Sequence, residues 1–282
     1  MDNYFRDKVA VVTGAAGVIC SEVSKDLADL GITVALVDRA IENAEKVAQE
    51  IRANGGTCAC YTCDVTDRES VNALADRVIA ELGRCDYLIN GAGGNNAKAQ
   101  PTITKFDPRE LDGTLPEGAR GLYNADMDAF EGVIKLNTMG SVYPLMAFAK
   151  YMVKQGGGSI VNFASMNTYC PLTRNFAYAM SKAAVANFTQ AFAAYFGEAG
   201  VRVNAIAPGF ILNPRSKLIL GSVEEGLTKR GQDVIDHTPM GDFGVAHDMC
   251  GAVRFLIDDR MSSFVTGITM PVDGGFLTLS GV

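Results

Sequence analysis

Short apolar runs rich in β-branched residues recur along the whole chain, and amphipathic stretches separate them. Because the runs are apolar at nearly every position, we expect both of their faces to be buried, as in a parallel sheet covered on two sides. The alternation predicts a doubly wound α/β fold with a seven-stranded, mainly parallel sheet. The expected strands are 8–13, 32–38, 57–65, 85–93, 158–165, 201–207 and 267–275, and the expected helices are about 17–30, 40–53, 67–82, 126–153, 175–199 and 245–257.

Two segments interrupt this alternation. Residues 94–125 are rich in Asn, Pro, Gly and mixed charge, and residues 210–244 are also irregular. Loops of this length in a compact domain usually serve as lids, contact surfaces or mobile segments. Pro144 falls within the helix expected over 126–153 and would kink or divide it. Because no repeat or low-complexity linker divides the chain, we interpret 1–282 as one domain with an insert at 94–125 and a substrate loop at 210–244.

Composition excludes several classes of partner. The net charge is −7 and there is no basic run, so neither nucleic acid nor an anionic membrane is an expected partner. No apolar stretch approaches the ~20 residues of a membrane helix.

The sequence also indicates a cellular location. The first residues lead directly into a strand pattern without signal-peptide features, and seven cysteines suit a reducing compartment, so a cytoplasmic location is expected.

Three of the cysteines, Cys58, Cys60 and Cys63, lie close together in the sequence. They could indicate a metal site, or they could be small apolar residues on a buried strand. No His lies nearby and no second pair of cysteines faces them. The strand interpretation is therefore favoured, and no metal is expected.

The stretch TGAAGVIC (13–20) joins the first run to the first helix. Gly14 would form a tight turn, Gly17 would let the backbone approach a pyrophosphate, and Val18 and Ile19 would offer N–H groups at the helix start. Cys20 stands where a third glycine usually permits close helix–strand packing, and its small size predicts only a slight shift of the helix. An ordinary strand-to-helix turn is the alternative.

Further polar residues follow the next strands at the same sheet edge. Asp38 ends the second run, where a carboxylate would accept hydrogen bonds from the ribose hydroxyls and would repel a 2′-phosphate. Asp64 follows the third run, and Asn90, Gly91 and Ala92 follow the fourth. Asp38 and Asp64 could instead cap the helices that start near 40 and 67. Together with the glycine turn, this arrangement predicts a dinucleotide site in a Rossmann fold.

A second group of residues could catalyse proton transfer. Tyr178 and Lys182 are four residues apart, hence on one face of a helix. A nearby ammonium would lower the tyrosine pKa from its reference of about 10 and make the phenol a usable acid or base. Ser165 ends the preceding strand, and the strand, its turn and the returning helix can bring Ser165 and Tyr178 together.

These residues carry a family resemblance. Over essentially its whole length the chain resembles the short-chain dehydrogenases/reductases. The landmarks are TGAAGVIC, DV (64–65), NGAG (90–93), LNTMG (136–140), Ser165, YAMSK (178–182), RVNAIAPG (202–209) and SSFVTGITMPVDGG (262–275).

The resemblance implies a catalytic tetrad of Asn137, Ser165, Tyr178 and Lys182. Tyr178 would exchange a proton with the substrate oxygen, Ser165 would hold that oxygen, Lys182 would bind the nicotinamide ribose and lower the Tyr178 pKa, and Asn137 would hold a water. It implies NAD as the cofactor, with NADP less favoured although Arg39 follows Asp38. It adds Val65, Pro208, Gly209 and Ile211 to the cofactor-binding residues, with Asn213 near the place of a threonine that contacts the carboxamide.

The substrate is constrained by the loops over this site. Asn95, Asn96 and Lys98 follow the fourth strand in an insert longer than is usual in the family, and Arg174, Arg215 and Lys217 lie in the two substrate loops. Amides suit hydroxyl groups and cationic side chains suit a carboxylate, so a sugar acid would use both. Each charge could also be solvated surface. The expected substrate residues are Asn95, Asn96, Lys98, Asn167, Arg174 and Arg215.

The glycine loop, the insert and the tail VDGGFLTLSGV resemble the family branch assigned as D-mannonate oxidoreductases, or fructuronate reductases. A dehydrogenase of another sugar, polyol or aldonate, such as gluconate 5-dehydrogenase, is the first alternative. A cofactor-binding regulator without catalysis is the second. The family resemblance also suggests a homotetramer that uses the helices over 126–153 and 175–199.

Overall fold

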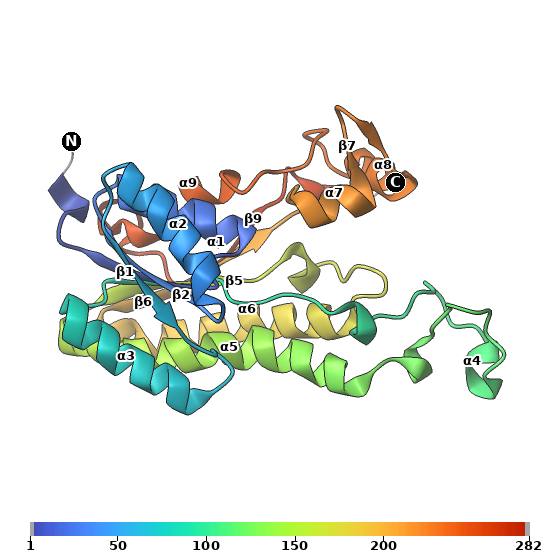
Figure 1. Ribbon diagram of the computed structural model, residues 1–282, viewed down its shortest axis with the longest axis horizontal. Helices are drawn as coiled ribbons and strands as arrows, with labels where there is room; N and C mark the ends of the chain where they lie inside the picture. Colours follow the sequence, from blue (N-terminus) through green and yellow to red (C-terminus); the bar gives the residue numbers. More distant parts are fainter. Residues whose placement is uncertain (1–2, 280–282) are drawn as a thin grey trace.

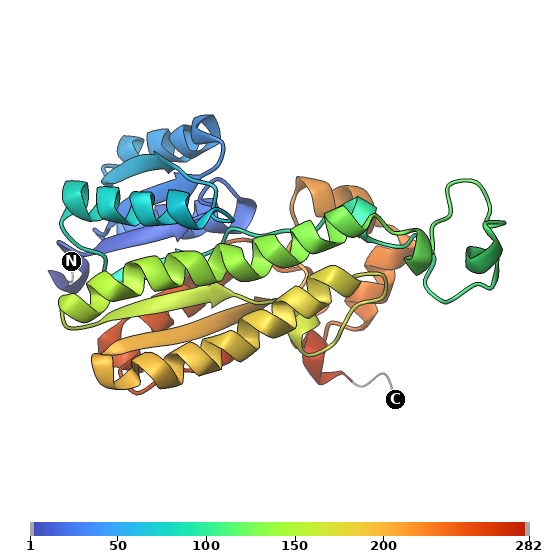
Figure 2. The ribbon, with the colours of Figure 1, turned by 90° about the horizontal axis from the view of Figure 1, so that it is seen from below.

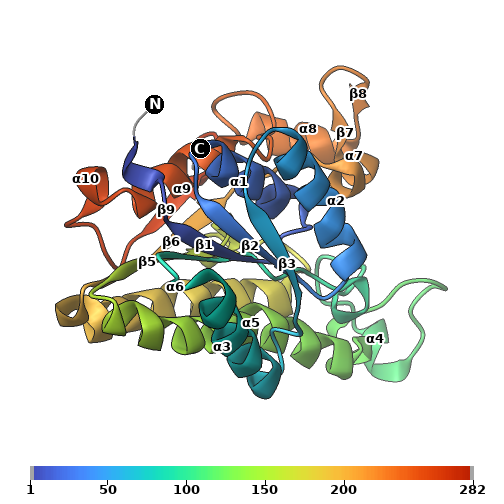
Figure 3. The same cartoon turned by 60° about the vertical axis from the view of Figure 1, so that its left-hand side comes forward.

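The structure is a computed structural model that describes residues 3–279, apart from the side chain of Arg215. A seven-stranded sheet runs through its centre in the order β3-β2-β1-β4-β5-β6-β9, and every neighbouring pair of strands is parallel (Figures 1 and 3). The doubly wound parallel fold predicted from the alternation is thereby confirmed. The strands are β1 (Val9–Thr13), β2 (Thr33–Asp38), β3 (Cys58–Thr62), β4 (Tyr87–Asn90), β5 (Gly158–Phe163), β6 (Val201–Pro208) and β9 (Thr269–Val272).

Helices cover both faces of this sheet (Figure 1). Neighbouring residues of β1 show why: Ala10 and Val12 pack into the apolar cluster under one helical layer, and Val11 packs into the cluster under the other. Side chains that alternate across a strand, all of them apolar, require cover on both sides. One layer holds α1 (Val18–Asp29), α2 (Ile41–Ala53) and α9 (Asp248–Ile257), and the other holds α3 (Arg68–Leu82), α5 (Met127–Lys154) and α6 (Phe176–Phe196).

Of the two expected effects of Pro144, a kink or a division, the division is not observed, because helix α5 is continuous through Pro144. Proline removes one hydrogen bond to the residue four positions earlier, here Gly140. Pro144 and Gly140 are both buried. Burial of the apolar face over 28 residues outweighs the loss of a single backbone bond.

The segment 210–244 is more regular than the sequence indicated. It contains α7 (Pro214–Leu220), a small hairpin of β7 (Gly221–Ser222) and β8 (Gly226–Leu227), and α8 (Lys229–Asp236). These elements are too short for a periodic pattern to reveal them.

The insert 94–125 holds three short helices: η2 (Ala97–Ala99), α4 (Arg109–Asp112) and η3 (Leu122–Asn124). Its middle part extends away from the rest of the molecule (Figure 2). The remaining short helices are η1 (Asn3–Phe5), η4 (Met166–Thr168), η5 (Gly197–Ala199), α10 (Asp259–Ser262) and η6 (Phe276–Thr278).

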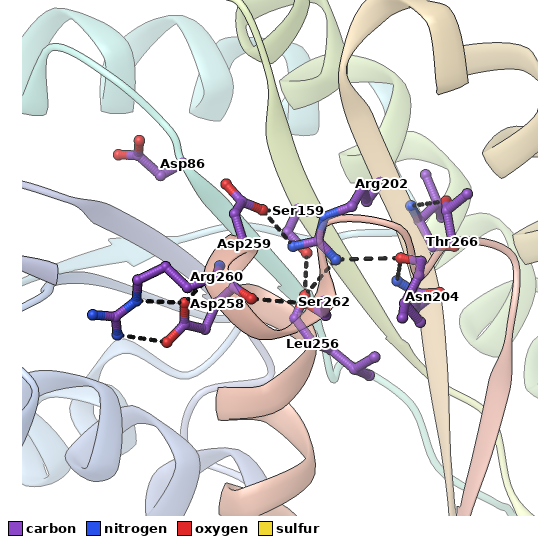
Figure 4. A network of polar contacts seen from close by, with 12 residues as sticks. Asp86, Ser159, Arg202, Asn204, Leu256, Asp258, Asp259, Arg260, Ser262 and Thr266 are labelled. Atoms are coloured by element: carbon purple, nitrogen blue, oxygen red, sulfur yellow. Dashed lines mark hydrogen bonds and ion pairs between the residues drawn. The ribbon is translucent and has the colours of Figure 1, made fainter. Parts of the chain in front are cut away.

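A polar network ties the amino-terminal end of β6 to the α9–α10 region (Figure 4). The buried Arg202 guanidinium donates to Asp259 at 2.7 Å and to the Leu256 carbonyl at 2.8 Å. Ser159 of β5 donates to the same Leu256 carbonyl at 2.8 Å. These bonds pair the buried polar groups at the end of the sheet opposite the glycine turn.

The cysteines are all free. Cys63 is buried, but Cys58 and Cys60 are only half-buried, because β3 is an edge strand and is covered less than the central strands. The expectation that these cysteines lie on a buried strand is therefore corrected for Cys58 and Cys60. Among residues 3–279, no group of three His, Cys, Asp or Glu side chains is placed to hold a metal ion. No helix in this range has the length and apolar character needed to cross a membrane.

Candidate active site

A cavity of about 390 Å³ opens at the carboxyl edge of the sheet, where β1, β4, β5 and β6 end. Ligands bind at this edge in open α/β sheets. Eleven of the residues expected to bind cofactor or to catalyse line it: Gly14, Gly17, Val18, Ile19, Gly91, Ser165, Tyr178, Lys182, Pro208, Gly209 and Ile211. Asn213 and Cys20 also line it, as do Gly93 and Phe163, which the sequence analysis did not single out.

A second cavity, of about 420 Å³, lies beside the first and shares Gly14 and Gly93 with it. Its lining includes the charged residues Asp38, Arg39 and Asp64, together with Val65 and Ala92, all of which were expected to bind the cofactor. Lys135 of α5 contributes as well, without any signal in the sequence. The two cavities together form an elongated site with the glycine turn at its middle.

The glycine turn requires glycine at Gly14. Its φ is +65°, and a Cβ there would lie 2.8 Å from the Cα of Ala92. Asp38 braces the turn, because its carboxylate accepts from the Ala16 N–H at 3.2 Å and from the Ala40 N–H at 3.0 Å. Ala40 itself is the N-cap of α2 and has no side-chain cap, so Asp38 is not the cap of that helix.

Cys20 occupies space that a glycine leaves free on the neighbouring loop. A Cβ on Gly91 would lie only 1.9 Å from the Cys20 Sγ. The thiol is buried, and burial raises its pKa to about 12. The glycine missing from α1 is thus balanced by a glycine after β4, and α1 packs closely on the sheet with a side chain present.

Ser165, Tyr178 and Lys182 converge on the first cavity. Ser165 follows β5, and Tyr178 and Lys182 lie in successive turns of α6. The Lys182 ammonium donates to the Phe163 carbonyl at 2.6 Å and lies 5.5 Å from the centre of the Tyr178 ring. The buried Ser165 hydroxyl accepts from the Asn167 N–H at 3.2 Å.

Burial dominates the electrostatics of this group. It raises the pKa of Tyr178, and a hydrogen bond with Ser165 acts in the opposite direction. Burial also lowers the pKa of Lys182 to about 8. The net pKa of Tyr178 is raised, and the hydrogen bond with Ser165 is what opposes this rise. The sequence predicted that Lys182 would lower this pKa, but the Lys182 ammonium donates to the Phe163 carbonyl instead.

Asn137 fixes the loop after β4 next to Lys182. Its amide donates to the Gly94 carbonyl at 2.8 Å and accepts from the Gly94 N–H at 3.1 Å. A Cβ on Gly93 would lie 2.6 Å from the Asn137 Oδ1 and 3.5 Å from the Lys182 Nζ. Asn137 is fully buried and lies behind the cavity wall.

Asp64 and Asn90 differ in their surroundings. Asp64 accepts from the N–H and the hydroxyl of Thr66, which lowers its pKa, while Asp67 caps α3. The Asn90 side chain is buried and donates to the Asn162 Oδ1 at 2.9 Å. Asn90 therefore ties β4 to β5, and its side chain is not part of either cavity wall.

The expected substrate residues are not brought to one place. Asn96 caps η2, the Asn167 amide and N–H bond to Ser165, and Lys98 is exposed. Asn95 donates to Asn175 at 2.9 Å, and Arg174 lines a separate cavity near them. Lys217 forms an ion pair with Glu225, while the side chain of Arg215 lies outside the described part of the structure.

Comparison with known proteins places these features in a family. A family model described as short chain dehydrogenase matches residues 8–219. The chain is 42% identical to an uncharacterized oxidoreductase of Haemophilus influenzae over 98% of this chain and 95% of that one. It is 31% identical to D-threitol dehydrogenase of Mycolicibacterium smegmatis over 95% of this chain and 92% of that one.

Solved structures are similar over the same length. A Haemophilus influenzae protein provisionally described as a D-mannonate oxidoreductase, with bound NAD, has a TM-score of 0.92 and 41% identity over 98% of this chain and 97% of that one. An NAD⁺-bound xylitol dehydrogenase has a TM-score of 0.81 and 31% identity over 96% of this chain and all of that one.

Proposed function

The chain belongs to the short-chain dehydrogenase family and is an oxidoreductase, and from this premise we propose that it transfers a hydride between NAD and a sugar acid. The reaction we propose is the interconversion of D-fructuronate and D-mannonate. The observation that carries the proposal is the convergence of Ser165, Tyr178 and Lys182 on the cavity that the glycine turn borders.

The two connected cavities fit a dinucleotide. A turn that excludes a Cβ at Gly14 lets backbone N–H groups approach a pyrophosphate at the start of α1. Asp38 and Asp64 line the cavity on the side away from Tyr178, and a carboxylate there suits ribose hydroxyls and repels a 2′-phosphate. We therefore propose NAD as the preferred cofactor over NADP, although Arg39 lines the same cavity.

The chain's own residues would manage the proton. NAD(H), when bound, supplies or accepts the hydride. In the direction of reduction, the Tyr178 phenol donates its proton to the substrate oxygen as the carbonyl becomes an alcohol, and in oxidation it takes that proton back. Ser165 donates a hydrogen bond to the same oxygen. The hydrogen bond with Ser165 favours the phenolate, Lys182 binds the nicotinamide ribose, and Asn137 holds a water beside Lys182.

A polyol or neutral sugar is the second candidate. The D-threitol and xylitol dehydrogenases similar to this chain support it, because both act on uncharged polyols by name. The Haemophilus influenzae protein with the higher identity supports the sugar acid. A regulator without catalysis has no such support, because the chain keeps a complete proton-transfer group inside the cavity.

A substrate screen tests the proposal. The purified protein is mixed with NADH or NADPH and with D-fructuronate, D-tagaturonate, 5-ketogluconate or D-fructose, and absorbance of the reduced cofactor is followed. We expect the highest kcat/KM with D-fructuronate and NADH. Turnover of fructose with no turnover of either uronate would replace the sugar acid with the second candidate.

We also propose a homotetramer in the cytoplasm. Apolar side chains exposed on α5 and α6 support association, and seven free cysteines suit a reducing compartment.

A further inference from the structure

A third cavity, of about 300 Å³, brings together three arginines from distant parts of the sequence. Arg120 comes from the insert, Arg174 from the loop before α6, and Arg230 from the first turn of α8. The rest of the lining is neutral, with Gln100, Thr102 and Asn175 as its main polar residues and no Asp or Glu. The cavity is therefore a concentrated positive site inside a chain with a net charge of −7.

The positive charge of this cavity is not neutralised by the protein around it. Arg120 donates to the Gln100 carbonyl at 2.9 Å, and Arg174 donates to the Thr102 carbonyl at 3.2 Å, which are uncharged acceptors. Arg230 forms no hydrogen bond and no ion pair with any residue in 3–279, although it is half-buried. Burial lowers the pKa of Arg230, and repulsion by the nearby charge of Arg174 lowers it further.

Two of these arginines occupy positions that do not favour their own local structure. Arg174 has a φ of +70°, a left-handed conformation that is unfavourable for a residue with a side chain. Arg230 lies near the amino terminus of α8, where the helix dipole disfavours a positive charge. Neither placement stabilises the folded chain by itself. A bound anion would compensate for both, because it would pair with the two guanidinium groups.

The cavity lies next to the reacting group. Asn175 lines it and precedes α6 directly, and Tyr178 follows about 5 Å further along the helix axis. The Asn175 Oδ1 accepts from Asn95 and from Gln100, which ties the insert to the start of α6. The insert, the start of α6 and the α7–α8 segment lie at the same end of the molecule (Figure 2).

We propose that Arg120, Arg174 and Arg230 bind the carboxylate of the substrate while Tyr178 addresses a carbonyl or hydroxyl several carbons away. This inference rests on the proposed function and deepens it, because it selects acids whose carboxylate is remote from the reacting carbon. Guanidinium groups suit the task, since their planar forks match the two oxygens of a carboxylate. Arg174 could be predicted from the sequence as a substrate residue, whereas Arg120 and Arg230 could not, because only the fold brings the three together.

Two substitutions test this inference. Arg230→Gln removes the guanidinium that has no hydrogen bond or ion pair among the described residues, and Arg174→Asn keeps a residue that tolerates positive φ. With NADH, we expect each to raise the KM for D-fructuronate and to lower the ratio of kcat/KM for D-fructuronate over D-fructose by roughly 10- to 100-fold. Arg109→Gln is the matched control, because Arg109 lies in the same insert but pairs with Asp107 outside the cavity. Thermal unfolding and NADH binding check that each variant is folded.

The outcomes separate the two proposals. If the wild-type protein reduces D-fructuronate and both variants have a KM for D-fructuronate within twofold of the wild type, the proposed carboxylate site is ruled out and the proposed function stands. If the wild-type protein reduces no sugar acid, the proposed function fails, and calorimetry of D-mannonate with NADH, a pair that cannot react, decides the site. Binding that Arg230→Gln weakens tenfold or more supports the anion site, and binding that is absent or unchanged in the variant overturns it.

Discussion

The Cys20 thiol and the missing side chain of Gly91 occupy the same space, so the two positions should depend on each other. Gly91→Ala places a methyl group 1.9 Å from the Cys20 Sγ, and such overpacking costs about 1–3 kcal/mol of unfolding free energy. Cys20→Gly should change NADH affinity little, and adding it to Gly91→Ala should recover at least half of the loss. The recovery is incomplete because the Thr13 carbonyl also lies 3.0 Å from the new methyl.

Urea unfolding of the wild type, both single variants and the double variant measures this coupling. Strictly additive losses would contradict the packing argument. A large gain in NADH affinity on Cys20→Gly would show instead that the glycine turn is compromised by its cysteine.

Tyr178 carries the proton in the mechanism we propose. Tyr178→Phe removes the hydroxyl and keeps the ring, so turnover of the best substrate should fall by roughly 10²- to 10⁴-fold. NADH affinity should change only slightly, because the phenyl ring still fills the same wall of the cavity. The absorbance of NADH measures the turnover, and a fluorescence titration measures the affinity for NADH. Unchanged turnover would remove Tyr178 from the mechanism.

The buried ammonium of Lys182 should lower the free energy of unfolding at neutral pH. Its pKa falls from 10.5 to about 8 on burial, so below pH 8 the folded protein carries an ammonium that burial penalises by up to about 3 kcal/mol. Between pH 8 and 10.5 the folded state releases its proton while the unfolded state keeps it, and the penalty disappears as the pH rises. Lys182→Met should therefore raise the free energy of unfolding at pH 7, raise it less at pH 9.5, and abolish turnover.

Urea unfolding at both pH values, with equal protein concentrations, isolates this effect as the difference between the two proteins. A variant that is less stable than the wild type at pH 7 would show that the bond from Lys182 to the Phe163 carbonyl matters more than the burial of charge.

Among the elements, those with a continuous apolar pattern could be predicted from the sequence, and the short helices of 210–244 could not. Strand β1 and helix α5 have continuous apolar patterns whose period is set by burial, so their positions were predicted to within a few residues. Helices α7 and α8 are only seven and eight residues long, and their packing depends on contacts with distant segments. For the same reason Ser165 and Tyr178 could be paired from their spacing, whereas Arg120 and Arg230 could not be joined to Arg174.

The insert divides into a stem that builds the arginine cavity and a tip that does not. Thr102 and Arg120 close the stem, since the Thr102 N–H donates to the Arg120 carbonyl and the Arg120 N–H donates to the Thr102 hydroxyl, both at 2.8 Å. Replacing 105–117 with a short glycine linker should keep this closure, because loop-length changes of this size alter closure entropy little. Melting temperature and NADH affinity should stay close to wild type. A collapse of either would show that the tip stabilises the site.

At the scale of the whole molecule, the two ends of the sheet carry different tasks. The amino-terminal end is held by the Arg202 network, where buried polar groups are paired within the chain (Figure 4). The carboxyl-terminal end holds the two adjoining cavities, the buried Lys182, and Arg230, which forms no hydrogen bond or ion pair within the part of the chain that the structure describes. Groups that destabilise the free protein are thus collected at the end that a cofactor and an anion would occupy, and binding of both should stabilise the fold by linkage.

The assembly we propose can be tested on the outer layer of helices. Met146 and Val153 of α5 are seven residues apart and Met180 and Tyr195 of α6 are fifteen apart, so each pair lies on one helix face, and all four are exposed. Helices α5 and α6 lie side by side in this layer (Figure 2), so the four side chains mark a surface suited to a second copy of the chain.

We expect light scattering at micromolar concentration to give four times the mass of one chain. Met146→Lys combined with Tyr195→Lys should lower that mass to a dimer or monomer, because two charges would be buried without partners at the interface. Gln49→Lys, on the exposed surface of α2 across the sheet, adds the same charge away from this layer and should leave the mass unchanged. A monomeric wild type would remove the tetramer, and a tetramer that survives both lysines would place its interfaces on other faces of the molecule.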